Sequence, residues 1–417
     1  MTATLAQLPV GARAGRKRIA GPGDLAINGA PPLFASPLQV GKPNLAGRAR
    51  FMELVEGMLD RAWLSNDGPL VQELELRIAE MLGVGHCICL NNATVGLSMA
   101  ARALGLAGEV IVPSYTFIAT PHALEWVGLK PVFVDIDPVT HNLDPRAVRA
   151  AITPRTSGIL AVHLWSRPAP VAELQAIADE HGLRLFFDAA HAFGVSLGGR
   201  MLGNFGACEV FSFHATKFFN AIEGGAITTN DDALARQLRL MRNFGFAGND
   251  NVVTIGTNAK MTEASAAMGL ANLEHLDAIV AVNRRNHRAY TQALGRVRGL
   301  SVLPFDDNER HNCQYLVLEV GPEYAAGRDA LLEALRAENV MARKYFWPGC
   351  HRMAHYAGDP AIAALPGTDL VAERVIVLPT GPSVGEDEIE AIVRADRLAM
   401  MRHTLPATCQ HCYRMTP

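Results

Sequence analysis

A lysine, an aspartate and a histidine in the middle of this sequence have the types and the spacing of a reactive site. Lys217 follows a β-rich run in "EVFSFHATKFFNAIEGG" (209–225), and Asp188 and His191 lie in "FFDAAHAFG" (186–194). A lysine after a strand is usually a solvated surface charge, and an aspartate there can simply cap a turn. The chemical alternative is an amine that acts as nucleophile and base beside a carboxylate and an imidazole.

The elements around these residues predict that they converge. Short apolar runs bounded by Gly, Pro, Asn or Asp alternate with helical patterns, which indicates an α/β fold with a largely parallel sheet. The predicted strands are 86–90, 109–113, 131–136, 159–163, 184–188, 209–213 and 225–229, with helices at 94–105, 170–182 and 231–245. Open parallel sheets bind ligands at the carboxyl ends of their strands. Asp188 and Lys217 follow two successive strands, so we expect both at one edge.

Four further residues lie where other predicted strands end. Ala93 and Thr94, in "LNNATVGL" (90–97), open a helix whose free N–H groups could hold an anion. An ordinary helix cap is the favoured interpretation of that stretch alone. Phe117 follows another strand, where an aromatic residue usually belongs to the core, and Ser212 precedes Lys217 by five residues.

One cofactor accounts for these features together, namely pyridoxal 5′-phosphate (PLP). It needs a lysine for its Schiff base, a carboxylate at the pyridine nitrogen, an anion site for its phosphate and a flat group against its ring. Lys217 would anchor the cofactor first and then act as the general base. Neither GxGxxG nor GxxxxGK[ST] occurs in the sequence, so a dinucleotide or P-loop site is poorly supported.

Composition narrows the class of protein. The 417 residues are 49% hydrophobic and carry a net charge of −3, which gives no reason to expect nucleic acid or an anionic membrane as a partner. No apolar run reaches the roughly 18 residues of a transmembrane helix. An odd count of seven cysteines favours a reduced cytoplasmic protein. "CQHC" (409–412), with His403 and His411 nearby, offers half a zinc site without a second pair, and we expect no metal.

The order of predicted strands and helices changes after a long helical stretch, and this change predicts two domains. Strands at 315–320 and 375–379 and helices at 328–340 and 386–401 form a smaller α/β unit. The basic "NRRNHRAY" (283–290) is expected to be a solvated helix face. We predict a mobile N-terminal tail (1–38), a large PLP-binding domain (39–280), a small C-terminal domain (281–402) and a C-terminal tail (403–417).

The ordered set of motifs resembles the DegT/StrS family of sugar-nucleotide aminotransferases, which are PLP-dependent enzymes of fold type I. The matching segments are "EVIVPSYTFIATPHALEWVGLKPVFVDIDPVTHNLDP" (109–145), "DAAHAFG" (188–194), "GNFGACEVFSFHATKFFNAIEGGAITTND" (203–231), "RLMRNFGF" (239–246) and "GTNAKMTEASAAMGL" (256–270). The resemblance covers roughly residues 40 to 400. It implies a large domain with a mostly parallel seven-stranded sheet and a smaller C-terminal α/β domain.

The resemblance also implies roles for individual residues. Lys217 would form the Schiff base, Asp188 would hold the pyridine nitrogen, and His191 would lie beside the ring and its O3′. Phe117 would stack on the ring. The implied phosphate contacts are Ala93, Thr94 and Ser212, with Asn258 reaching the phosphate of the neighbouring subunit. A homodimer with shared active sites follows from that last assignment.

Within the family, "HATKFFNAIEGG" (214–225), "RNFGF" (242–246) and "RKYFWPGCHRM" (343–353) look most like enzymes that aminate C4 of dTDP-4-keto-6-deoxyhexoses. Such enzymes take the amino group from L-glutamate, with PMP as intermediate, and make amino sugars for antibiotics or surface glycans. Arg343, Lys344 and Tyr345 are candidate contacts of the nucleotide diphosphate. A surface strand with exposed basic residues is an equally open interpretation of that stretch.

Three alternatives differ in chemistry. Transfer to C3 depends on how the sugar ring is turned, which the sequence does not show. Relatives that dehydrate the sugar carry His in place of the Schiff-base lysine, so Lys217 argues against them. A non-catalytic binding module would be expected to lose Lys217 or Asp188.

Two departures from the family pattern stand out: "NNAT" (91–94) at the phosphate turn, and Ser166 where glycine is expected. Serine avoids positive φ, so Ser166 could alter a loop near the site.

Overall fold

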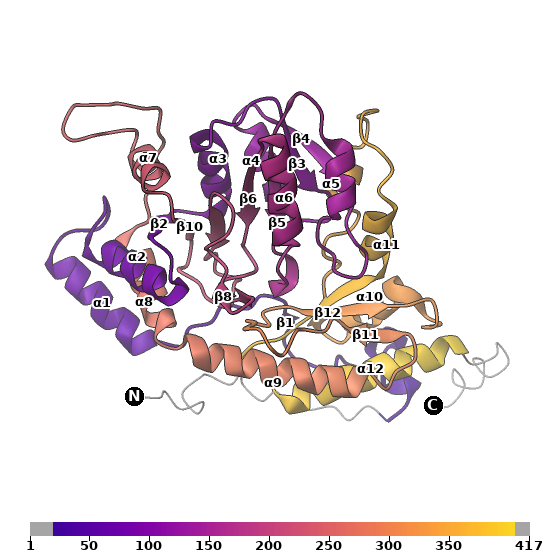
Figure 1. Cartoon of the computed structure of the whole chain (residues 1–417). Helices are drawn as coiled ribbons and strands as arrows, with labels where there is room; N and C mark the ends of the chain where they lie inside the picture. Colours follow the sequence, from indigo (N-terminus) through magenta and orange to yellow (C-terminus); the bar gives the residue numbers. More distant parts are fainter. Residues whose placement is uncertain (1–19, 405–417) are drawn as a thin grey trace.

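A seven-stranded sheet forms the centre of the larger part of the molecule, shown by a computed structural model that describes residues 20–404 (Figure 1). In spatial order its strands are β2 (His86–Leu90), β10 (Gly225–Thr229), β9 (Glu209–Ser212), β6 (Arg184–Asp188), β5 (Thr156–Val162), β3 (Glu109–Pro113) and β4 (Lys130–Val134). Strand β10 is antiparallel to both of its neighbours, and the remaining pairs are parallel. The predicted sheet is confirmed.

Helices cover both faces of this sheet, because its strands are apolar on both sides. Phe186 and Phe187 are successive residues of β6, yet they pack in different hydrophobic clusters on the opposite faces. The covering helices are α1 (Arg48–Asp60), α2 (Pro69–Leu82), α3 (Ala93–Ala103), α4 (Ala119–Glu125), α5 (Pro145–Ala151), α6 (Val171–His181), α7 (Asp232–Arg242) and α8 (Glu263–Leu273). Short pieces between them are η4 (Leu164–Ser166), β7 (Ser196–Leu197) and β8 (Arg200–Met201).

Two glycines bring helix α3 close to the sheet. A Cβ atom on Gly96 would lie 2.9 Å from a methyl group of Val210, and one on Gly225 would lie 2.7 Å from the backbone nitrogen of Ala93. Both distances are shorter than a real Cβ contact. A side chain at either glycine would collide with its neighbours. The two glycines therefore allow the first turn of α3 to lie directly beside the end of β9, which is Ser212, and the start of β10.

A smaller antiparallel sheet completes the chain. It consists of β11 (Leu300–Val302), β12 (Leu316–Val320) and β14 (Val375–Leu378), packed against α9 (Leu276–Leu294), α10 (Gly327–Ala337) and α12 (Glu386–Thr404). Other pieces are β13 (Val340–Met341), η5 (Cys350–Arg352) and α11 (Pro366–Arg374). Helix α9 runs along the base of the molecule from the helices of the larger part to the small sheet (Figure 1). The predicted domain limit at 280/281 falls within α9 and stays a prediction.

Residues 20–38 pack on the smaller part, although the sequence analysis assigned them to a mobile tail. The carboxylate of Glu338 accepts hydrogen bonds from the backbone nitrogens of Ala26 (2.6 Å) and Leu33 (2.7 Å). Strand β1 (Leu38–Gln39) pairs with β13, and η2 (Pro22–Asp24) and η3 (Ala26–Asn28) precede it. Local sequence patterns do not predict these contacts, because Glu338 lies some three hundred residues away along the chain.

The "CQHC" segment (409–412) lies outside the described residues. His403 belongs to the last turn of α12, where only the backbone is described. Among residues 20–404, every helix is too short or too polar to cross a lipid bilayer.

Candidate active site

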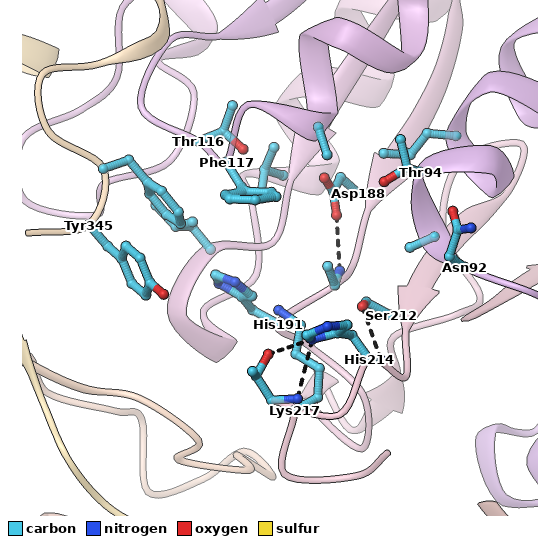
Figure 2. A pocket seen from close by; sticks show the side chains of 18 of the residues that line it. Asn92, Thr94, Thr116, Phe117, Asp188, His191, Ser212, His214, Lys217 and Tyr345 are labelled. Atoms are coloured by element: carbon cyan, nitrogen blue, oxygen red, sulfur yellow. Dashed lines mark hydrogen bonds between the residues drawn. The ribbon is translucent and has the colours of Figure 1, made fainter. Parts of the chain in front are cut away.

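A cavity of about 780 Å³ opens at the edge of the large sheet where β3, β6 and β9 end. The first turn of α3 forms one side, and residues of the smaller part close another. Nine of the predicted site residues line it: Ala93, Thr94, Phe117, Asp188, His191, Ser212, Lys217, Arg343 and Tyr345. Figure 2 shows Thr94, Phe117, Asp188, His191, Ser212, Lys217 and Tyr345 arranged around a common space. The structure does not bring Asn258 or Lys344 to this cavity.

Asp188 is the last residue of β6, and it is 6% exposed. One carboxylate oxygen accepts a hydrogen bond from the hydroxyl of Thr120 (2.7 Å) and the other from the backbone nitrogen of Ala190 (3.0 Å). Burial raises the pKa of this carboxyl group, while these hydrogen bonds and Lys217 oppose the shift. No basic side chain within residues 20–396 forms an ion pair with Asp188. A cationic group of a ligand could therefore form an ion pair with the carboxylate of Asp188.

Lys217 enters the cavity from the loop after β9, with its amine 3.3 Å from the hydroxyl of Tyr315. Burial lowers the pKa of Lys217 to about 8, and the carboxylate of Asp188 opposes part of that shift. At pH 8 about half of such lysines are neutral, against under about 1% for an ordinary lysine. This amine is available both as a nucleophile and as a proton acceptor.

His191 lies beside Lys217, and one nitrogen of its ring has no hydrogen-bond partner among the described residues. Its ring stacks on the indole of Trp165 with centroids 5.5 Å apart. Nδ1 is buried, and no atom of the described residues forms a hydrogen bond with it. Burial holds the pKa of His191 well below its ordinary value, so the imidazole is neutral. An oxygen atom of a ligand could satisfy this nitrogen.

The side of the cavity at α3 is suited to an anion. Asn92 caps the helix by accepting a hydrogen bond from the backbone nitrogen of Val95 (2.9 Å). Ala93 and Thr94 follow in the first turn, where backbone N–H groups carry partial positive charge. The hydroxyl of Ser212 lies at the same wall. The unusual "NNAT" sequence (91–94) therefore keeps a capped helix end at the cavity.

Phe117 is 57% exposed, which is unusual for a phenylalanine, and its ring lines the cavity. It can cover the face of a flat ligand. Elsewhere in the lining, the guanidinium of Arg343 stacks on the ring of Tyr345 at 4.9 Å. In the part of the chain with described side chains, no carboxylate pairs with Arg343. This free cation can meet an anionic part of a ligand.

Lys344 and Asn258 have other surroundings. The Lys344 amine lies 3.4 Å from the Asp329 carboxylate and 4.2 Å from the centroid of the Trp347 ring. Asn258 pairs with Asn243 through the backbone, and its carbonyl oxygen accepts a hydrogen bond from the side chain of Asn91 (3.3 Å).

Comparison with known proteins identifies this arrangement. The model of the DegT/DnrJ/EryC1/StrS aminotransferase family matches residues 46–396. The chain belongs to this family. The "dTDP-4-amino-4,6-dideoxy-D-glucose transaminase" of Escherichia coli is 37% identical over 360 residues, covering 86% of this chain and 97% of that protein. "GDP-perosamine synthase" of Caulobacter vibrioides is 35% identical and covers 86% of this chain and 97% of that protein.

Solved structures of sugar aminotransferases have the same fold. The crystal structure of DesI matches with a TM-score of 0.87 and 49% identity, covering 94% of this chain and 99% of that one. DesV of S. venezuelae matches with a TM-score of 0.79 and 31% identity, over 85% and 95% of the two chains. The chain is thus a sugar aminotransferase with the fold type I architecture, and both predictions from the sequence are confirmed.

Several residues of this aminotransferase site were missed in the sequence. Thr120 lies in "SYTFIAT" (114–120), one helical turn after Phe117, so its position after a strand was a usable signal. Trp165 follows the predicted strand 159–163 by two residues and offered the same signal. Tyr315 carried no such signal, because it opens a predicted strand 98 residues after Lys217 and only the folded arrangement places its hydroxyl there.

Ser166, expected to be glycine in this family, has a φ of 63°. A left-handed conformation is strained for serine. Its hydroxyl proton lies between two acceptors and is shared by them: the carbonyl oxygen of His191 (3.0 Å) and the side-chain oxygen of Asn312. These bonds offset the strain and tie the loop to the backbone of His191.

Proposed function

We propose that this aminotransferase moves an amino group from L-glutamate to the C4 keto carbon of a dTDP-linked 4-keto-6-deoxy sugar, with PLP as its cofactor. The observation that carries the proposal is the meeting of Lys217 and Asp188 in one cavity at the carboxyl edge of the sheet. The E. coli relative is named for a 4-amino sugar linked to dTDP, and DesI was crystallised with its TDP-sugar product. Both support a substrate of this class.

The residues of the cavity fit the chemical groups of PLP. When bound, PLP supplies an electron sink during proton removal and carries the amino group between the two half-reactions as PMP. Asp188 would neutralise the protonated ring nitrogen, because it is a buried carboxylate that lacks a cationic partner among the described side chains. The unpartnered Nδ1 of His191 would bind the ring hydroxyl. Phe117 would cover the ring face, and the first turn of α3 with Ser212 would hold the phosphate.

Lys217 has two duties in this proposal. Its amine would hold PLP covalently between reactions. Once the amine is released by an incoming amino group, it takes a proton from the substrate carbon and returns it at the cofactor. The lowered pKa, about 8, leaves about a tenth of the free amine unprotonated at pH 7 and about half at pH 8, and this neutral fraction is able to accept that proton.

The diphosphate of the substrate would meet Arg343 at the mouth of the cavity. Arg343 lines the cavity without an acidic partner among the described side chains, and its guanidinium lies over the ring of Tyr345. Lys344 was predicted to share this role, but its amine is paired with Asp329. We therefore assign the contact to Arg343 and Tyr345 alone.

A homodimer would complete the site. The segment 243–258, after α7, extends away from the body of the molecule (Figure 1) and is rich in exposed apolar side chains. These are Phe244 (46% exposed), Phe246 (39%), Val252 (57%), Val253 (55%) and Ile255 (66%). A surface of this kind is typical of a subunit interface. Asn258 ends the segment outside its own cavity, which supports the assignment to the phosphate of the partner subunit.

The proposal is tested with purified protein loaded with PLP. The lysine-bound cofactor should absorb in the visible range, become fixed by borohydride, and lose that absorbance when L-glutamate is added. Lys217→Ala should abolish covalent fixation and turnover, whereas Lys130→Ala, a change at an exposed lysine of β4, should leave both intact.

The product from a dTDP-4-keto-6-deoxy sugar, analysed by NMR, identifies the aminated carbon. An amino group at C3, or a dehydrated sugar, would overturn the assignment to C4. Full turnover by Lys217→Ala would overturn the assignment of the anchor.

A further inference from the structure

A second concave surface lies along helix α9, with a volume of about 700 Å³. Its wall combines basic and apolar side chains: Gly194, Phe218, Leu276, Asp277, Val280, Ala281, Arg284, Arg285, Arg288, Arg310 and His311. We call it the arginine groove. Four arginines face one aspartate within it. None of these residues lines the active-site cavity, so the groove is a separate site.

The helical repeat of α9 explains why the arginines gather there. Arg284 and Arg288 are four residues apart and therefore project from the same face, together with Val280 and Ala281 one turn earlier. Neither guanidinium forms a hydrogen bond or an ion pair within the described side chains. Two adjacent cations without partners repel one another, and a bound anion would remove that repulsion.

The other two arginines are held in place. Arg285 donates to the side-chain oxygen of Asn286 (2.8 Å) and the backbone oxygen of Val384 (3.3 Å). Arg310 lies 3.3 Å from Asp277, but both side chains are largely exposed, so this pair is weak. The groove thus contains four arginines and one carboxylate, Asp277. Arg285 is held by hydrogen bonds and Arg310 is weakly paired, while the other two have no partner among the described side chains. This arrangement suits a ligand with more than one negative charge.

The remaining wall is apolar. Phe218, Val280 and Ala281 offer hydrocarbon surface beside the guanidinium groups. A ligand that matches both parts has a diphosphate at one end and a flat, partly apolar group at the other. We propose that the arginine groove is a binding site for a nucleoside diphosphate, with the diphosphate on Arg284 and Arg288 and the nucleoside on the apolar wall.

The groove lies directly behind the active-site loop. Phe218 follows Lys217, and its backbone nitrogen donates to the side-chain oxygen of Gln314 (3.4 Å), next to Tyr315. His311 contacts the backbone oxygen of Ser166 (2.9 Å), whose hydroxyl binds the carbonyl oxygen of His191. Three arginines of the stretch 283–290, which was expected from the sequence to be a solvated face, therefore line a groove that also includes Phe218, the residue after the reactive lysine.

Calorimetric titration of the full-length, PLP-loaded protein with thymidine diphosphate tests the proposal. Two classes of binding site are expected, one in the active-site cavity and one in the groove. The double variant Arg284→Gln/Arg288→Gln should weaken one class at least about tenfold, which corresponds to the loss of one charge-assisted contact. Arg343→Gln should weaken only the other class.

The matched control is Arg296→Gln/Arg298→Gln, which removes the same charge just beyond the end of α9, outside the groove. It should leave both classes unchanged, and circular dichroism should show all variants folded. The proposal is overturned if the groove variant keeps both classes, or if the control weakens binding equally. Inorganic pyrophosphate should bind the groove more weakly than thymidine diphosphate, and equal affinities would overturn the assignment of the nucleoside.

Discussion

The hydroxyl oxygen of Tyr315 lies 3.3 Å from the amine of Lys217, and that amine lies 5.6 Å from the centroid of the same ring. Lys217 follows β9 of the large sheet, whereas Tyr315 directly precedes β12 of the small one. The small sheet therefore helps to position the reactive lysine. Its contribution is a packed ring and one hydrogen bond, and each can be removed separately.

Tyr315→Phe should keep the ring and lose the hydrogen bond. We expect kcat to fall about three- to tenfold, the effect of about 1 kcal/mol in the barrier, with little change in KM for L-glutamate. Tyr356→Phe is the matched control, because it removes a hydroxyl of the same kind at a buried tyrosine that does not line the active-site cavity. Steady-state kinetics of both variants measures the difference, and an unchanged kcat in Tyr315→Phe would refute a positioning role.

Asp188→Asn should remove the charge while keeping the shape, and its one amide oxygen can still accept the hydrogen bond from the backbone nitrogen of Ala190. We expect kcat to fall by about a hundredfold or more, because the ring nitrogen of the cofactor would lose the partner that stabilises its protonated form. Thr120→Val provides the comparison, since it keeps the charge of Asp188 and removes the 2.7 Å hydrogen bond to the carboxylate together with the 2.9 Å bond to the Thr116 hydroxyl, and it should cost less than about tenfold. Equal losses in the two variants would contradict the role of the charge.

The pH dependence of the proton transfer should follow the free amine of Lys217. Its pKa is lowered to about 8, so the neutral base is present above that pH and is lost as the pH falls. The single-turnover rate with L-glutamate should rise about tenfold per pH unit below 8 and level off above it. The Asp188 carboxylate raises the pKa of Lys217, so Asp188→Asn should move the midpoint to lower pH. A midpoint near pH 10 would show that Lys217 has the pKa of an ordinary lysine and would contradict the prediction.

Ser166 allows strain and hydrogen bonding to be separated. Ser166→Ala keeps the positive φ but loses the hydroxyl bonds to His191 and Asn312, so it should destabilise the fold by about 1–3 kcal/mol. Ser166→Gly loses the same bonds yet relieves the strain, and its loss should be about 1 kcal/mol smaller. Denaturant unfolding measures both, and an Ala variant as stable as the Gly variant would argue against strain at this position.

The proposed homodimer can be tested on the apolar segment 243–258. Phe246→Glu would bury a charge in the interface, so we expect dissociation to monomers in light scattering and a loss of most activity. Val139→Glu introduces the same charge at a residue that is 73% exposed and lies elsewhere on the surface. It should leave the assembly intact. A Phe246→Glu protein that keeps the mass of the wild type would contradict an interface at this segment.

Local patterns in the sequence determined much of the site. Apolar runs bounded by turn residues defined the strands, and the residues just after them, Asp188 and Lys217, had to meet because parallel strands end at one edge. The cavity that both line confirms this convergence. A helix beginning at Ala93 was visible in the same way.

Contacts between distant segments could be decided only by the tertiary structure. Tyr315 reaches Lys217, Glu338 holds the residues around Ala26, and the amine of Lys344 turns toward Asp329 and away from the cavity. Sequence patterns report which face of an element is buried, because burial repeats with the period of a helix or strand. They do not report which side chain of another element lies opposite, since that depends on how the two sheets of this chain pack together.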